Sequence, residues 1–198
     1  MKAVVSIIAA GLLLGCASGG TTPELTQYLL RSSAPATSGE AEGLTDVGIG
    51  HVRVADYLDQ PGIVVEMAPG QIRPAQYHEW AESLGTGLEL FLRPEIAGVV
   101  GHDIDIDPAR RSDWRLTVDI DIVEFHGTLS GSARLNASWT LTNAKGDLVA
   151  AFRFAETESL TRSGYGGLVD AQTRLASRLG AAVGQSIRDA GPLSAPQS

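Results

Sequence analysis

Four histidines are the residues of this chain best suited to bind a metal ion or to move a proton near neutral pH. They are His51, His78, His102 and His126. No two of them have a spacing, such as four residues along a helix, that would direct both side chains toward one metal ion. Glu79 follows His78, but the second histidine of a zinc-protease motif is missing. The histidines are therefore predicted to be scattered over the surface and the strand edges, and no metal site is expected.

Three aspartates at alternate positions, Asp103, Asp105 and Asp107, have the spacing that begins a calcium-binding loop. Such a loop also needs Gly at its sixth position and Glu at its twelfth, where this chain has Pro108 and Trp114. We therefore expect a solvated acidic loop whose carboxylates pair with the adjacent arginines at positions 110 and 111.

Other arrangements that could support catalysis are incomplete. Neither Ser-Gly pair, at 130–131 and 163–164, has the Gly-x-Ser-x-Gly setting of a nucleophile elbow. Asp119 and Asp121 share one face of a predicted strand and are expected to face solvent rather than to act as a catalytic pair. The sequence thus predicts a non-catalytic protein without a cofactor.

The thiol of Cys16 is the remaining reactive group, and it is the single cysteine of the chain, which excludes an internal disulfide. An apolar run, residues 3–14, precedes it and itself follows the positively charged Lys2. Crossing about 30 Å of hydrocarbon takes roughly 20 residues, so this run is too short to span a membrane and is typical of a signal peptide.

The end of the apolar run, Leu13-Leu14-Gly15-Cys16, resembles the lipobox of bacterial lipoproteins. Thioether linkage to a diacylglyceryl group requires a thiol, and signal peptidase requires a small residue such as Gly15 at the cut. We therefore predict that residues 1–15 are removed and that acyl chains on Cys16 hold the protein in a membrane.

The charge of the chain is consistent with a purely hydrophobic anchor. The formal net charge is −8, and loss of Lys2 with the signal peptide makes it −8 − 1 = −9. An acidic protein is a poor partner for nucleic acid and for anionic lipid headgroups. Ala17 stands where an aspartate would resemble an inner-membrane retention signal, so we expect an outer-membrane lipoprotein that faces the periplasm.

Hydrophobic periodicity predicts an α+β domain over residues 27–190, between a flexible tether at 16–26 and a disordered tail at 191–198. The expected strands cover residues 27–30, 47–54, 63–67, 71–73, 115–125, 133–141 and 148–154. One helix is expected from Gln76 through 92, with a kink or a restart at Pro94 and a continuation to residue 100, and a second over 168–189. These elements predict an antiparallel-dominated mixed sheet with two main helices packed on one face.

Several stretches of the domain resemble a known family, the PqiC-type lipoproteins, also called ABC-type transport auxiliary lipoproteins. The specific parts are Tyr-Leu-Asp-Gln-Pro-Gly-Ile-Val at 57–64 and Trp-Ala-Glu-Ser-Leu at 80–84, with Tyr-Leu-Leu at 28–30 behind the lipobox. A second region, Asp-Trp-Arg-Leu-Thr-Val-Asp-Ile at 113–120, with Phe-His-Gly at 125–127 and Ala-Ser-Trp-Thr-Leu at 137–141, supports the same resemblance.

This resemblance implies a non-catalytic subunit of a lipid transport system that links the inner and outer membranes and supports envelope integrity. The implied partners are an MCE-domain protein and an inner-membrane permease or ATPase, and self-association into a homo-oligomer is also implied. Tyr57 and Trp80 are candidate interface residues because aromatic side chains are enriched at binding hot spots. Both could instead belong to the core, which the apolar helical spacing favours for Trp80.

Two other functions stay open from the sequence. A stand-alone periplasmic carrier of lipid or of a small ligand would need a large apolar cavity. A periplasmic hydrolase would need a serine, a histidine and an acid that converge in space.

Overall fold

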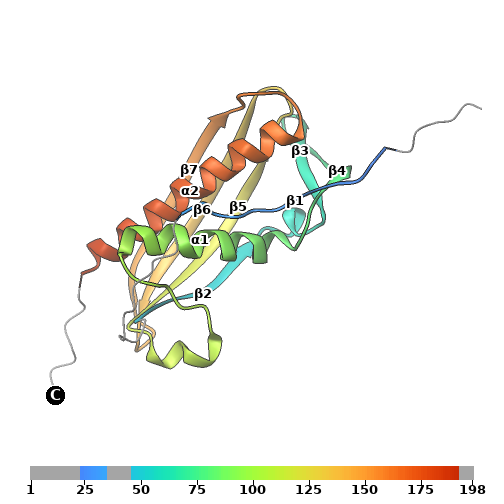
Figure 1. Ribbon diagram of the computed structural model, residues 1–198. Helices are drawn as coiled ribbons and strands as arrows, with labels where there is room; N and C mark the ends of the chain where they lie inside the picture. The colour runs from blue at the N-terminus through green and yellow to red at the C-terminus, as the bar shows by residue number, and fades with distance from the viewer. Residues whose placement is uncertain (1–22, 35–45, 192–198) are drawn as a thin grey trace, which may run out of the picture.

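The computed structural model describes residues 23–34 and 46–191, which build a seven-stranded mixed sheet and two long helices (Figure 1). The strands lie in the order β1-β4-β3-β5-β6-β7, and β2 pairs with β5 beside this path. Both helices cover the same face of the sheet, so the predicted α+β architecture is confirmed.

An antiparallel meander of three strands forms the larger part of the sheet: β5 (Leu116–Gly127), β6 (Ser132–Asn143) and β7 (Leu148–Ser159). Every second residue of β5, from Leu116 to Ile122, is buried against the helices, as the alternating pattern predicts. The register of β5 against β6 then shifts between Ile122 and Glu124, and Val123 is exposed. This irregularity is a β-bulge, and it lies where the apolar residues of the sequence change phase, from Ile122 to Val123 and Phe125.

The remaining strands bring parallel pairs into the sheet. β2 (Val47–Val54) runs parallel to the first half of β5, and β3 (Gly62–Ala68) meets its end, where Val65 pairs with Gly127. Between these two strands lies a short 3₁₀ turn, η1 (Asp56–Leu58). β4 (Gln71–Trp80) forms an antiparallel hairpin with β3 and carries the short strand β1 (Thr26–Tyr28) parallel to it at the outer edge.

The prediction of a helix from Gln76 is wrong, because residues 71–80 form β4 and the helix α1 spans Leu84–Val100. Backbone pairing on both sides of β4 outweighs the helical spacing of its apolar residues, since Thr26 pairs with His78 and Gly62 with Glu79. The helix begins only after Ser83, whose hydroxyl caps it by accepting a hydrogen bond from the Thr86 amide at 3.3 Å. It continues through Pro94 to Val100.

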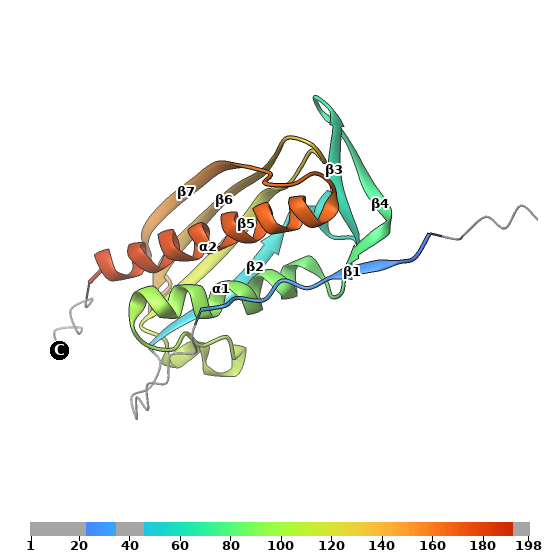
Figure 2. The same cartoon turned by 45° about the horizontal axis from the view of Figure 1, so that its top comes forward.

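Helix α2 (Tyr165–Asp189) packs beside α1 on the sheet, as Figure 2 shows. The apolar residues that recur at helical spacing along α2 form one fully buried stripe: Leu168, Ala171, Leu175, Leu179, Val183 and Ile187. The two helices approach closely at glycines of α2, where a Cβ added to Gly184 would lie 2.7 Å from the Cβ of Val99. A small residue is therefore needed at this crossing.

Two Gly→Ala substitutions should have opposite effects on stability. In Gly184→Ala the new methyl group pushes α1 and α2 apart, which we expect to lower the free energy of unfolding by about 1–3 kcal/mol. In Gly98→Ala, on α1, the new methyl group meets no atom within 4 Å. This substitution should raise the free energy of unfolding by about 0.5–1 kcal/mol, because alanine has the higher helix propensity. Urea unfolding followed by circular dichroism measures both. Equal effects of the two substitutions would contradict the tight crossing.

Candidate functional site

The predicted anchor, Cys16 with Leu13, Leu14 and Gly15, lies outside the residues that the structure describes. The described chain begins at Pro23, just before β1. Within 23–34 and 46–191, no helix is long and apolar enough to cross a membrane. The predicted tail, apart from Gly191, also lies outside the described residues.

Tyr57 lies on η1, over the end of β5. Its neighbour Leu58 is buried in the core, while the phenol ring of Tyr57 is half-buried. The hydroxyl donates a hydrogen bond to the carbonyl of Val123 at 3.1 Å and lies 3.0 Å from Nδ1 of His126. Burial, reinforced by the charge of Glu124, raises the pKa of Tyr57 to about 12, so the hydroxyl is neutral at any physiological pH. Tyr57 thus has a structural role that ties η1 to the β5 bulge.

His126 is the centre of a polar cluster on the sheet face away from the helices. Its ring is buried, and its neighbour on β6 is Arg134, which forms an ion pair with Glu66 of β3. Burial, with a smaller contribution from the Arg134 charge, lowers the pKa of His126 below its usual value despite the nearby acids. We call Tyr57, His126, Glu66 and Arg134 the Tyr57–His126 cluster.

The lowered pKa of His126 predicts a stability that depends on pH. Below the ordinary histidine pKa of about 6.5 the unfolded chain binds a proton that the folded chain resists. Stability should therefore be fully present above this value and decline as the pH falls from about 6.5 toward the folded pKa. His126→Asn should flatten this decline, because it removes the buried group that the unfolded chain protonates first. Thermal unfolding between pH 7.5 and 5 measures it, and an unchanged slope in His126→Asn would contradict the prediction.

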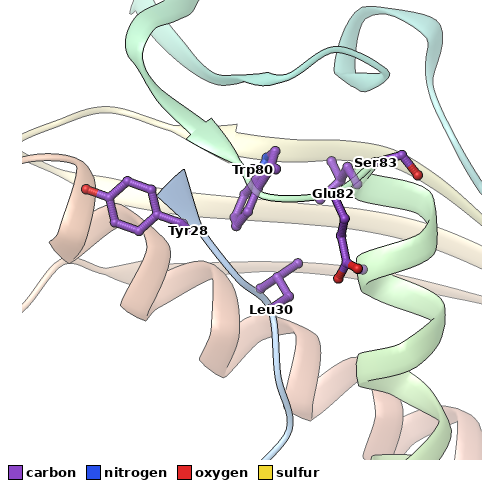
Figure 3. Close-up of a pocket in the computed structure, with 7 residues that line it drawn as sticks. Tyr28, Leu30, Trp80, Glu82 and Ser83 are labelled. Carbon is purple, nitrogen blue, oxygen red and sulfur yellow. The ribbon is translucent and has the colours of Figure 1, made fainter. Parts of the chain in front are cut away.

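Trp80, the second candidate interface residue, ends β4 and is 6% exposed. Its ring lies 6.1 Å from that of Phe125, inside the main core. A depression beside it opens between β1 and the start of α1, and Figure 3 shows its residues, which are Tyr28, Leu30, Trp80, Glu82, Ser83, Leu84 and Gly87. Its side chains leave no interior space even for a water molecule, so this depression is too shallow to enclose an acyl chain.

The acidic segment differs in one respect from the solvated loop expected. Asp105 is buried and accepts a hydrogen bond from the indole Nε1 of Trp114 at 3.1 Å, and its backbone bridges to Gly48 of β2. Its predicted pairing with Arg110 is confirmed, at 3.2 Å. Burial alone would raise the pKa of Asp105, but hydrogen bonds from the Asp107 amide and the indole outweigh it and lower the pKa. No sequence pattern marks this contact.

Asp119, Asp121 and the histidines at 51 and 78 also take part in structural contacts. Asp119 lies 3.0 Å from the ring of His51, and Asp121 lies 3.3 Å from the guanidinium of Arg53, across the parallel pair of β2 and β5. His78 stacks on Tyr165 with ring centroids 4.0 Å apart. In the described part of the chain, no group of three or more His, Cys, Asp or Glu side chains is arranged to hold a metal ion.

Solved structures share this fold over most of the chain. One is the crystal structure of an uncharacterized protein, with a TM-score of 0.70 and 21% identity, covering 83% of this chain and 99% of that one. Another is a Xanthomonas campestris protein, with a TM-score of 0.65, 15% identity and the same coverage of both chains. No curated protein is similar enough to match.

A family model described as "ABC-type transport auxiliary lipoprotein component" matches residues 28–184, which run from β1 almost to the end of α2. The match therefore spans nearly all of the strands and most of both helices. The chain belongs to the family of ABC-type transport auxiliary lipoprotein components.

Proposed function

We propose that this protein is the lipid-anchored, non-catalytic subunit of an MCE-linked ABC-type lipid transport system. It would be held in the outer membrane by Cys16, face the periplasm, and help to link the two membranes and maintain the envelope. The family match over residues 28–184 is the observation that carries this proposal. The partners proposed are an MCE-domain protein and the inner-membrane permease or ATPase of the same system.

Features of the fold support action by binding. Polar residues that could have served a metal or catalytic site take part in structural hydrogen bonds instead, His126 with Tyr57 and Asp105 with Trp114. The depression beside Trp80 is too shallow for an acyl chain, so it does not supply the apolar cavity that the alternative, a stand-alone lipid carrier, would need.

Self-association is a further part of the proposal. β7 is an edge strand of 12 residues, and its outer side is free for another strand, at least among the described residues. An unpaired edge of this length can add a strand from a second chain. Light scattering of the purified mature protein tests this, and a monomeric mass at micromolar concentration would contradict it.

A pull-down tests the partners. The lipidated protein, solubilised in detergent, is the bait, and mass spectrometry identifies what it retains. We expect an MCE-domain protein, in the same yield when Cys16→Ser bait is supplied at matched concentration, because the lipid only places the domain. Tyr57→Ala bait tests the proposed interface once circular dichroism has shown that it keeps its fold, because Tyr57 also ties η1 to β5. Tyr57 is half-buried, whereas Trp80 presents little surface. Recovery of the bait alone with bound lipid would contradict the partnership and favour the stand-alone carrier.

A substitution beside the anchor tests the proposed location. Ala17→Asp introduces the residue that resembles an inner-membrane retention signal. In an enteric host we expect the wild-type protein in the dense outer-membrane fraction and the variant in the lighter inner-membrane fraction. A wild-type protein found in the inner-membrane fraction would contradict the outer-membrane assignment.

A further inference from the structure

Exposed apolar side chains gather on one edge of the sheet. Eight large apolar residues of the described chain are exposed, and five of them belong to strands β1, β3 and β4 or adjoin β1: Leu25, Leu29, Met67, Ile72 and Tyr77. We call these five residues the apolar edge. Single exposed apolar residues are normal on a protein surface, but a group of them marks a surface that contacts another protein or a membrane.

Strand pairing places four members of the apolar edge at two positions along the β3–β4 hairpin. Thr26 pairs with His78, so the preceding residues, Leu25 and Tyr77, lie side by side. Ile72 pairs with Glu66, which places Ile72 and Met67 next to the turn of the β3–β4 hairpin. Figure 2 shows this hairpin standing out from the rest of the sheet. The tip of the hairpin is therefore free to contact a membrane or another surface.

The apolar edge is also where the chain enters the fold. Figures 1 and 2 both place the first described residues at the end of the molecule that carries the β3–β4 hairpin, and the end of α2 at the opposite end. Nine peptide steps separate Cys16 from Leu25. At about 3.5 Å per residue, they span at most about 30 Å. Acyl chains on Cys16 would thus hold this end of the molecule, and not the other, close to the lipid surface.

The charge distribution favours contact between the apolar edge and lipid. The mature chain is acidic, yet neither residues 25–30 nor residues 67–78 contain Asp or Glu. Arg73, within the second segment, is exposed, whereas Arg31, next to the first, is exposed but forms an ion pair with Glu82. An exposed arginine such as Arg73 among apolar and aromatic residues suits the headgroup region, where the side-chain stem lies on apolar surface and the guanidinium reaches phosphate.

We propose that the apolar edge lies in the headgroup region of the membrane that holds the acyl chains of Cys16. This inference rests on the proposed lipidation of Cys16 and adds an orientation to it. The opposite end of the meander, where Asn143 pairs with Leu116 and β7 begins at Leu148, then points away from the membrane. That end is the one a partner spanning the periplasm would reach first.

Site-specific fluorescence on the full lipidated protein tests this orientation. A thioether-linked Cys16 does not react with thiol reagents, so one new cysteine can carry the label. Met67→Cys and Tyr77→Cys report on the apolar edge. Leu148→Cys is the matched control, because Leu148 is as exposed as Met67 but lies at the far end of the meander. Each labelled protein is reconstituted into phosphatidylethanolamine–phosphatidylglycerol vesicles, with and without brominated acyl chains, after mass spectrometry has confirmed acylation.

The labels at positions 67 and 77 should lose fluorescence in the brominated vesicles, and the label at 148 should keep it. Equal quenching at 67 and 148, or quenching at 148 alone, in a protein confirmed to be acylated would overturn the orientation and leave the anchor standing. A mature protein without acyl chains would overturn the proposed anchor and, with it, this inference.

Discussion

Replacing Cys16 by Ser should abolish acylation completely and leave residues 1–15 attached. The sulfur is the atom that forms the thioether, and the chain has no other cysteine to take its place. Growth with an alkyne-tagged palmitate analogue should label the wild-type protein and leave the variant unlabelled. The intact mass should show a wild-type chain that begins at position 16 with its acyl groups, and a variant that still begins at Met1.

The size of this effect follows from the energetics of acyl insertion. Each buried methylene contributes about 0.8 kcal/mol, and a single myristoyl chain binds a membrane reversibly with an association constant of about 10⁴ M⁻¹. A second acyl chain on the same cysteine makes the attachment effectively permanent. Loss of acylation should therefore remove this membrane anchor from every molecule. Ser18→Ala, two residues downstream, is the control and should be acylated as the wild type is. Palmitate label on the Cys16→Ser variant would show that the lipidation site had been assigned to the wrong residue.

Alternation within single strands made much of the fold predictable. In β5 and β6 the buried and exposed residues alternate as the sequence does, and the change of apolar phase at Val123 is enough to predict the bulge in β5. The apolar stripe of α2 was equally clear, since a long amphipathic helix repeats its signal over many turns. Both patterns depend only on residues close together in the chain, so they can be recognised without knowing the tertiary contacts.

Long-range contacts determine the features that the sequence did not predict. Residues 76–80 have a helical spacing of apolar side chains, but β1 and β3 supply backbone partners on both sides, and the segment becomes the end of β4. Long-range pairs of this kind override local propensity. The same holds for the Tyr57–His126 cluster, because Tyr57 and His126 are far apart in sequence and no spacing rule joins them.

Trp114 illustrates the same limit within the acidic segment. The spacing of Asp103, Asp105 and Asp107 is that of a metal-binding loop, whereas the segment is held by structural contacts that include one buried indole. Trp114 is 2% exposed and packs on Gly48 so closely that a Cβ added there would lie 2.2 Å from the ring. The glycine in β2 and the tryptophan before β5 are therefore one packing unit, although 66 residues separate them.

Trp114→Ala should be among the most destabilising single substitutions in this domain. It removes a fully buried ring above Gly48 and leaves the buried carboxylate of Asp105 without the indole donor, which lies 3.1 Å away. Truncating a buried Trp to Ala costs about 3–5 kcal/mol, a large share of the roughly 5–15 kcal/mol that stabilises a typical domain. Trp114→Phe keeps most of the ring and should lose only about 1–3 kcal/mol, mainly from the lost hydrogen bond to the buried carboxylate, which keeps its contacts with Arg110 and the Asp107 amide. Urea unfolding of both variants beside Leu148→Ala, an exposed truncation expected within about 0.5 kcal/mol of wild type, measures the difference. A Trp114→Ala variant as stable as Leu148→Ala would show that the 101–115 connector is held by contacts other than the indole.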